Sequence, residues 1–207
     1  MSKHIFLLKM QQDKPQSNKK LVYNYNMKTI LKMIESNKEI KNEKELWVLL
    51  DTLKKNINSL VKESKILLDN GYYSRSFFLS YCALEELGKR LIVCDYITGI
   101  LSKTEFDSAF RDHAMKIAYL HNNCQLLKND DSSLEATIVY DKDKFKSWLK
   151  ERNKALYVGF NQLIIDPLKE VTSEDAQSIF AYLLKSIDDT NYYETVNERI
   201  GSKAFYK

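Results

Sequence analysis

Glycine and proline are scarce in this chain, which contains 5 glycines and 2 prolines among 207 residues. Folds built from β-sheets need frequent tight turns, and glycine and proline are the residues that such turns favour. Apolar residues instead recur at three- and four-residue spacings over long stretches. This spacing is typical of helices with one apolar face. The sequence therefore predicts an all-α fold, and its length suits a domain with a substantial core.

Long apolar runs and paired cysteines are also missing. No apolar run approaches the roughly 20 residues that span a bilayer, and the apolar segment 5–8 is shorter than the about 7–15 residues at the centre of a secretory signal. Cys82, Cys94 and Cys124 are odd in number and lie inside apolar helical patterns, so we expect buried free thiols. The three histidines show no zinc spacing. We expect a cytoplasmic protein with no membrane segment, metal site or cofactor.

Neither sign of charge dominates, since the formal net charge is +4. The charge is uneven, however, because residues 1–65 carry 14 lysines and no arginine against 7 acidic residues. A basic front half could steer the protein toward RNA or another polyanion. A lysine-rich solvated face explains the same numbers, and we favour that interpretation. Charge alone implies no nucleic-acid binding and no DNA specificity.

The apolar pattern divides the chain into two parts. Residues 1–26 are polar and interrupted by Pro15, which predicts a flexible N-terminal extension, and residues 27–207 form a single all-helical domain. Five long helices are expected, at residues 43–70, 72–100, 102–127, 142–157 and 172–187. Between them, residues 128–140 read as a polar loop and residues 158–167 as a connection.

The last of these helices carries a start signal and a clear apolar stripe. Thr172 followed by Asp175 resembles a capping box with aspartate in place of glutamate. The side chains that this helix is expected to bury are Ala176, Ile179, Phe180, Leu183, Leu184 and Ile187.

Two carboxylates and a lysine interrupt the most apolar of the predicted helices, at residues 72–100. Glu85, Glu86 and Lys89 lie between uncharged stretches on both sides. A helix that is apolar nearly all round is usually buried. An ionised carboxylate there costs several kcal/mol unless it is paired and hydrogen-bonded. The fold must therefore bring a cation or several donors to Glu85 or Glu86.

Two other predicted helices also carry a polar residue on an apolar stripe, namely His113 and Arg152. In a helical bundle such stripes face a common interior, so we expect these groups to meet, with Lys116 nearby. The guanidinium of Arg152 suits a buried carboxylate, because its planar fork binds both oxygens. Spacing alone favours a structural ion-pair network that fixes helix register. A site for acid–base and phosphate chemistry is the second interpretation.

The same residues carry a family resemblance. Residues 67–73, followed by 80–89 with Glu-Glu-Leu-Gly-Lys, resemble the AbiV family of bacterial abortive-infection proteins, a branch of the HEPN helical bundles. Residues 110–116, residues 151–158, and Pro167 with residues 172–176 are similar to later segments of that family, in the same order. The resemblance covers about residues 45–187.

This resemblance implies a compact HEPN-like bundle that forms a homodimer and acts in defence against phage. It also implies a mechanism, because many HEPN proteins are metal-independent ribonucleases whose site is an arginine followed after four to six residues by a histidine. The chain departs from that pattern, since Tyr157, Val158 and Gly159 occupy the positions where the histidine belongs. His113 would then have to supply the imidazole from another helix.

Two hypotheses follow. In the first, the protein is an RNA-directed toxin in which Arg152 binds the scissile phosphate and His113 transfers protons. The residues assigned to catalysis are Arg152, His113, Glu86 and Lys89, and those assigned to binding are Glu85, Lys116, Asn153 and Tyr157. In the second, it is a non-enzymatic dimeric module that blocks translation by contact with the ribosome or another target. Both expect a trigger, such as a phage-encoded activator protein.

Overall fold

The computed structural model describes residues 21–25, 43–97, 101–126, 136–140, 142–161 and 163–197. These ranges contain seven helices and four short strands, which confirms the predicted all-α fold. The helices are α3 (Glu43–Asp69), α4 (Tyr73–Ile97), α5 (Lys103–Arg111), α6 (His113–Leu126), α7 (Lys142–Lys154), α8 (Pro167–Glu170) and α9 (Ser173–Asn197). The strands are β1 (Leu21–Tyr25), β2 (Ala136–Tyr140), β3 (Gly159–Asn161) and β4 (Leu163–Ile165).

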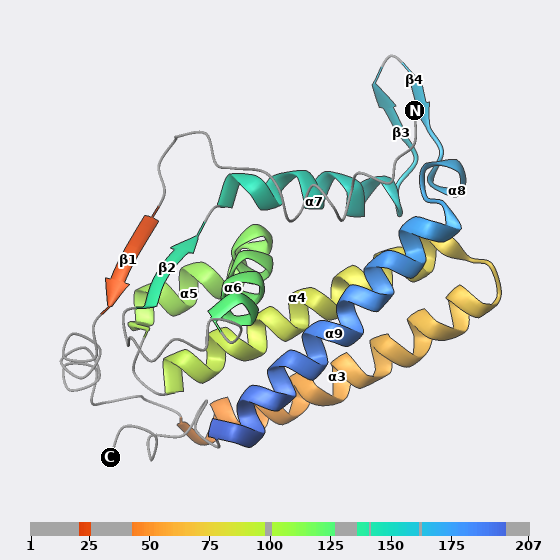
Figure 1. Ribbon diagram of the computed structural model, residues 1–207. Helices are drawn as coiled ribbons and strands as arrows, with labels where there is room; N and C mark the ends of the chain where they lie inside the picture. The colour runs from red at the N-terminus through yellow and green to blue at the C-terminus, as the bar shows by residue number, and fades with distance from the viewer. Residues whose placement is uncertain are drawn as a thin grey trace.

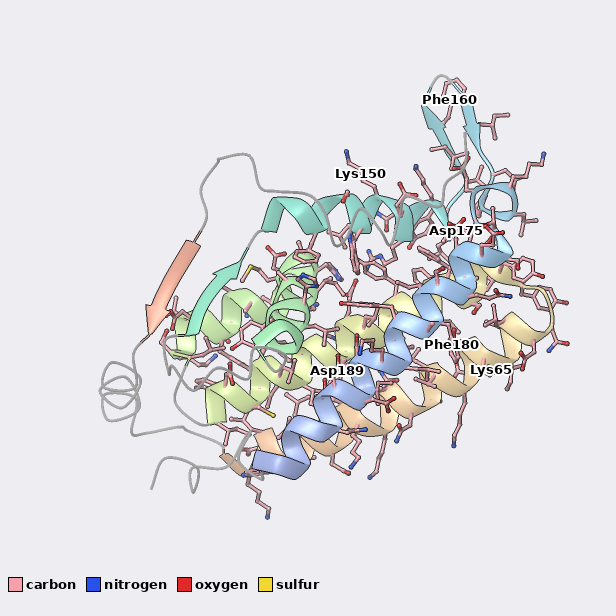
Figure 2. All side chains as sticks on the ribbon, viewed as in Figure 1. Lys65, Lys150, Phe160, Asp175, Phe180 and Asp189 are labelled. Atoms are coloured by element: carbon pink, nitrogen blue, oxygen red, sulfur yellow. The ribbon has the colours of Figure 1, made fainter. Side chains whose placement is uncertain are left out.

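Helix α4 is the centre of the bundle. The long helices α3 and α9 run along it, α6 packs on it, and α7 lies across α6 and α4 (Figure 1). Seventeen of its 25 residues are buried, so almost its whole circumference is covered, as its apolar sequence predicts. Side chains fill the space between these helices (Figure 2). A charged group on a buried face of α4 is therefore surrounded by side chains of the neighbouring helices.

A tight turn and a serine cluster fix α3 against α4. Gly71 ends the α3 segment with φ +78, and the Tyr72 amide donates to the Leu67 carbonyl at 2.9 Å, which is the expected glycine stop. Ser64 is fully buried and its hydroxyl lies 2.6 Å from that of Ser80 and 2.9 Å from the carbonyl of Ser76. These small side chains bring the two helices close together and set the register of α4.

The helix predicted at residues 102–127 is wrong in one respect, because it is broken at Asp112. Ser102 caps α5 in a capping box with Glu105, and α5 ends where Asp112 takes an extended conformation (φ −82, ψ 117). The Asp112 carboxylate then accepts from the amides of Ala114 and Met115, at 2.9 and 3.2 Å. Aspartate competes with a continuing helix by capping the next one. His113 is consequently the first residue of α6.

Strands replace parts of the predicted loops. In the stretch 128–140, residues 136–140 form β2, which pairs antiparallel with β1 of the predicted N-terminal extension. Residues 1–20 of that extension lie outside the described residues. In the connection 158–167, β3 and β4 form an antiparallel hairpin that projects beyond the end of α7 (Figure 1). Short runs of β-branched and aromatic residues, such as those at 137–140 and 163–165, favour strands without giving a long periodic signal.

The ends of α7 and α9 also differ in part from the prediction. Helix α7 ends at Lys154 rather than near Tyr157, and α9 continues to Asn197, ten residues beyond the predicted end at residue 187. The predicted capping box is present at the start of α9, where the Thr172 hydroxyl and amide donate to Asp175 at 2.7 and 3.0 Å. Ala176, Ile179, Phe180 and Leu183 are buried as expected, whereas Ile187 is partly buried and Leu184 is 41 % exposed.

The structure describes the side chains of two of the three cysteines. Cys82 is a partly exposed free thiol and Cys94 is buried, whereas the side chain of Cys124 lies outside the described residues. Among the described helices, none has an apolar stretch long enough to cross a membrane. The described residues also contain no group of three or more histidine, cysteine or acidic side chains that could hold a metal ion.

Candidate functional site

The centre of the candidate site is the buried carboxylate of Glu85. It projects from α4, its side chain is 7 % exposed, and it contacts two other helices. Nη1 of Arg152, in the last turn of α7, donates to Oε1 at 2.5 Å. Nδ1 of His113, at the start of α6, lies 2.6 Å from Oε2. The cation and the donor that a buried carboxylate requires therefore come from two helices distant in sequence.

His113 is held on one side and open on the other. A carboxylate only accepts hydrogen bonds, so the proton in the bond to Glu85 belongs to Nδ1. The second ring nitrogen, Nε2, is then the acceptor of the neutral imidazole. Half of the His113 side chain is exposed to solvent. An oriented imidazole with an open acceptor nitrogen is the arrangement that proton transfer requires.

Arg152 is fixed from several directions. Its side chain is 16 % exposed, and besides Glu85 it uses Nε and Nη2 to donate to Oδ1 of Asn153, at 3.3 and 3.2 Å. Its guanidinium carbon lies 5.7 Å from the ring centroid of Tyr81, a cation–π contact. Asn153, which the sequence predicts as a binding residue, is thus a direct hydrogen-bond partner of Arg152. Together these contacts hold the guanidinium beside His113, with 3.4 Å between Nη1 and Nδ1.

Tyr81 belongs to the site, although it is not among the residues predicted from the sequence. It is 1 % exposed, lies one helical turn before Glu85, and contacts Trp148 of α7 edge-on at 6.2 Å. Among the described residues, its hydroxyl is the one buried side-chain polar atom without a hydrogen-bond partner. Burial, followed by the Glu85 charge, raises the pKa of Tyr81 far above its ordinary value. Its position four residues before a buried glutamate is the signal that could have identified it.

A second cluster of charged side chains, formed by Glu86, Lys89 and Lys116, lies beside the Glu85 cluster. Glu86 pairs with Lys89, three residues later on α4, and Nζ of Lys89 lies 5.7 Å from the ring centroid of Phe110. Lys116 of α6 is 4 % exposed. Burial and the neighbouring Lys89 charge lower the pKa of Lys116, and the Glu85 and Glu86 carboxylates oppose that shift. Two ammonium groups are therefore held near two carboxylates at the edge of the site.

Gly88 explains how α4 and α6 come close enough to form this site. A Cβ atom added to Gly88 would lie 2.1 Å from the carbonyl oxygen of Lys116, so any side chain at this position would force the helices apart. In the sequence, this glycine is distinguished only as part of a family segment. A single glycine in the interior of an apolar helix is the available signal, since it lowers helix stability unless a close approach needs it.

The structure thus brings together most of the predicted site residues. Glu85, rather than Glu86, contacts Arg152 and His113, and Glu86 forms an ion pair with Lys89. Tyr157 lies elsewhere: it is 62 % exposed, and no hydrogen bond or ion pair of the described residues joins its side chain to Glu85, His113 or Arg152.

Cys82 lies close to this site but is a poor nucleophile. Burial, with a contribution from the Glu85 charge, raises the pKa of the Cys82 thiol to about 11. At neutral pH the thiol therefore stays protonated, and only a thiolate attacks effectively. The chemistry of the site consequently rests on the imidazole, guanidinium, ammonium and carboxylate groups.

Comparison with known protein families gives a match over most of the chain. A protein-family model described as AbiV, of the HEPN type, matches residues 45–185. No curated protein and no solved structure matches the chain. The matched range covers more than half of the chain and contains every residue of the site around Glu85.

Proposed function

The chain belongs to the AbiV family of HEPN-type proteins, and from this premise we propose that it is a metal-independent ribonuclease whose site is the Glu85–His113–Arg152 cluster. Membership of this family makes it an abortive-infection protein, which acts in defence against phage. In our proposal, infection triggers the cleavage of RNA, which shuts down gene expression in the cell. A phage-encoded protein would be the trigger.

The observation that carries the proposal is the orientation of His113. Glu85 binds Nδ1 and leaves Nε2 as the acceptor, on a side chain that is half exposed. Nε2 would take the proton of the ribose 2′-hydroxyl, whose oxygen then attacks the adjacent phosphorus. The bond from phosphorus to the 5′-oxygen breaks, and that oxygen takes a proton from water. The products are a 2′,3′-cyclic phosphate and a free 5′-hydroxyl.

The cations beside His113 suit a phosphate substrate. Arg152 has N–H groups beyond those bonded to Glu85 and Asn153, and guanidinium groups bind phosphate oxygens well. Lys89 and Lys116 add positive charge at the edge of the site. A phosphodiester bound there would relieve the repulsion between the two ammonium groups. Glu85 would position both His113 and Arg152 rather than react itself.

The test compares two histidines of the same helix. Purified wild type, His113→Asn and His121→Asn are incubated with total bacterial RNA in a chelator, with and without lysate from phage-infected cells. His121 lies on α6 and packs against the Phe145 ring, outside the Glu85 cluster. We expect fragments ending in 2′,3′-cyclic phosphate from wild type and His121→Asn. His113→Asn should lose at least about 100-fold in rate. Equal cleavage by His113→Asn would contradict the proposal.

One observation favours a second function. The contacts of Arg152 with Glu85, Asn153 and Tyr81 are the contacts of a structural arginine, and no histidine follows at the HEPN spacing. The protein would then block translation by binding the ribosome or another target, without cleaving RNA. Intact RNA in every reaction, together with translation that stalls only when wild type is added to the infected lysate, would support this alternative.

A further inference from the structure

The hairpin after α7 carries an unusual amount of exposed apolar surface. We define the hairpin face as the side chains of Tyr157, Val158, Phe160, Ile164 and Leu168. They are 62, 76, 81, 75 and 76 % exposed, and they are five of the ten large apolar side chains that are exposed in the described residues. We propose that this hairpin face is a contact surface between two copies of the chain.

The geometry of the hairpin makes this surface continuous. Phe160 and Ile164 are directly opposite each other in the β3–β4 ladder, so their side chains point to the same side of the hairpin. Leu168 follows on α8, immediately after β4. Phe160 lies at the projecting end of the molecule, away from the helices of the bundle (Figure 2). A partner could therefore approach the hairpin without meeting the body of the protein.

The charge distribution selects an uncharged partner. Residues 155–165 contain no charged side chain, although 29 % of the chain is charged. Beside Leu168, the ammonium group of Lys169 pairs with the Asp166 carboxylate at 3.6 Å, so the two charges at this end of the face oppose each other. A second copy presents the same uncharged surface, so pairing about a two-fold axis brings no like charges together despite the net charge of +4. A partner with a charged surface would lose the hydration of those charges without gaining an opposite charge.

The amount of surface also fits a dimer. Five side chains of this size at these exposures present on the order of 600 Å² of apolar area per chain. That is the upper end of what monomeric proteins expose, roughly 300–600 Å², and it approaches the about 800 Å² that each partner contributes to a standard interface.

The backbone of the hairpin offers a further means of pairing. Within the described part of the chain, β3 and β4 pair only with each other, so each strand has one free edge. A hairpin of two short strands is marginally stable by itself. An antiparallel edge can pair with the same edge of a second copy, because that arrangement is symmetric. A dimer would thereby give the hairpin both additional hydrogen bonds and apolar cover.

The test is the oligomeric state of matched variants. Sedimentation velocity is measured over a concentration series for wild type, Phe160→Lys, Ile164→Lys and Ile66→Lys. Ile66, on α3, is 61 % exposed and serves as the matched isoleucine control. We expect wild type and Ile66→Lys to sediment at twice 24.3 kDa. Each hairpin variant should raise the dissociation constant at least about tenfold.

Several results would overturn the proposal. A wild type that stays monomeric at every concentration would do so, and so would hairpin variants that dimerise as well as Ile66→Lys. Loss of dimerisation in all three variants would show a nonspecific effect of added charge. A monomeric wild type whose protection against phage is lost only in the hairpin variants would assign the face to a different protein. Circular dichroism verifies that each variant is folded, which the high exposure of the substituted positions favours.

Discussion

Gly88 of α4 and the backbone carbonyl of Lys116 on α6 are in direct contact, and a Cβ atom at position 88 would lie 2.1 Å from that oxygen. Because the obstacle is backbone rather than the end of a flexible side chain, only a shift of one helix could relieve it. The Glu85–His113 bond joins the same two helices, three residues from Gly88 on α4 and three from Lys116 on α6. This contact therefore controls the geometry of the site.

We expect Gly88→Ala to destabilise the protein by about 2–4 kcal/mol, measured by urea unfolding at neutral pH. In a helix interior this substitution would otherwise be favourable by about 1 kcal/mol. Gly71→Ala is the control: its φ of +78 makes alanine cost about 1–2 kcal/mol, but its nearest contact is 4.0 Å away. A Gly88→Ala protein as stable as wild type would show that α4 and α6 are not in contact here.

The two adjacent glutamates should respond differently to the same substitution. Glu85→Gln leaves the Arg152 guanidinium without its counter-charge and should lower the free energy of unfolding by about 3–5 kcal/mol. This variant should also lose the defence activity. Glu86→Gln removes only a partly exposed pair with Lys89 and should cost about 1 kcal/mol or less. Chemical unfolding and a phage plaque assay on both variants measure these differences. Equal losses would mean that the structure assigns the wrong carboxylate to the site.

Tyr81 offers a substitution that should not weaken the fold. Tyr81→Phe removes a buried hydroxyl that has no hydrogen-bond partner and keeps the ring beneath Arg152, so we expect unchanged stability or a gain of about 1 kcal/mol. Tyr81→Leu also loses the cation–π and Trp148 contacts and should cost about 1–3 kcal/mol. Thermal unfolding distinguishes the two. A large loss in Tyr81→Phe would reveal a partner for the hydroxyl.

Asp95 should make the fold more stable in mild acid. Burial raises the pKa of its carboxyl from 3.8 to about 6, although Tyr119 donates a hydrogen bond to it. The folded state then binds this proton more tightly than the unfolded state, so this contribution is greatest below the unfolded pKa and is lost as the pH rises through 6. Between about pH 4.5 and pH 7 the loss is about 2 kcal/mol.

The measurement for Asp95 is a comparison across pH. Asp95→Asn keeps an acceptor for the Tyr119 hydroxyl and should remove this part of the pH dependence. Asp69→Asn, at an exposed site on α3, should leave the pH dependence of stability unchanged. If wild type and Asp95→Asn lose the same stability between the two pH values, the carboxyl is already ionised at the lower one.

Much of the fold follows from local patterns in the sequence. Helices α3, α4 and α9 have long apolar stripes or apolar surroundings, and their predicted starts agree with the structure to within a residue or so. The break at Asp112 and the strands β1 to β4 were not predicted. A cap inside a continuous apolar stripe, and strands of three to five residues, give no periodic signal over a window long enough to detect.

The apolar sequence around residues 77–94 is enough to predict that the central helix is buried. It also requires that a glutamate within this helix find a cation, because an unpaired buried carboxylate is too costly. The sequence also indicated Arg152 and His113 as the partners. That Glu85, rather than Glu86, contacts them is a result of how the helices pack. Adjacent residues of a helix point about 100° apart, so the choice depends on the angle at which other helices cross α4. That angle is set by contacts such as Gly88 with Lys116, which no local pattern specifies.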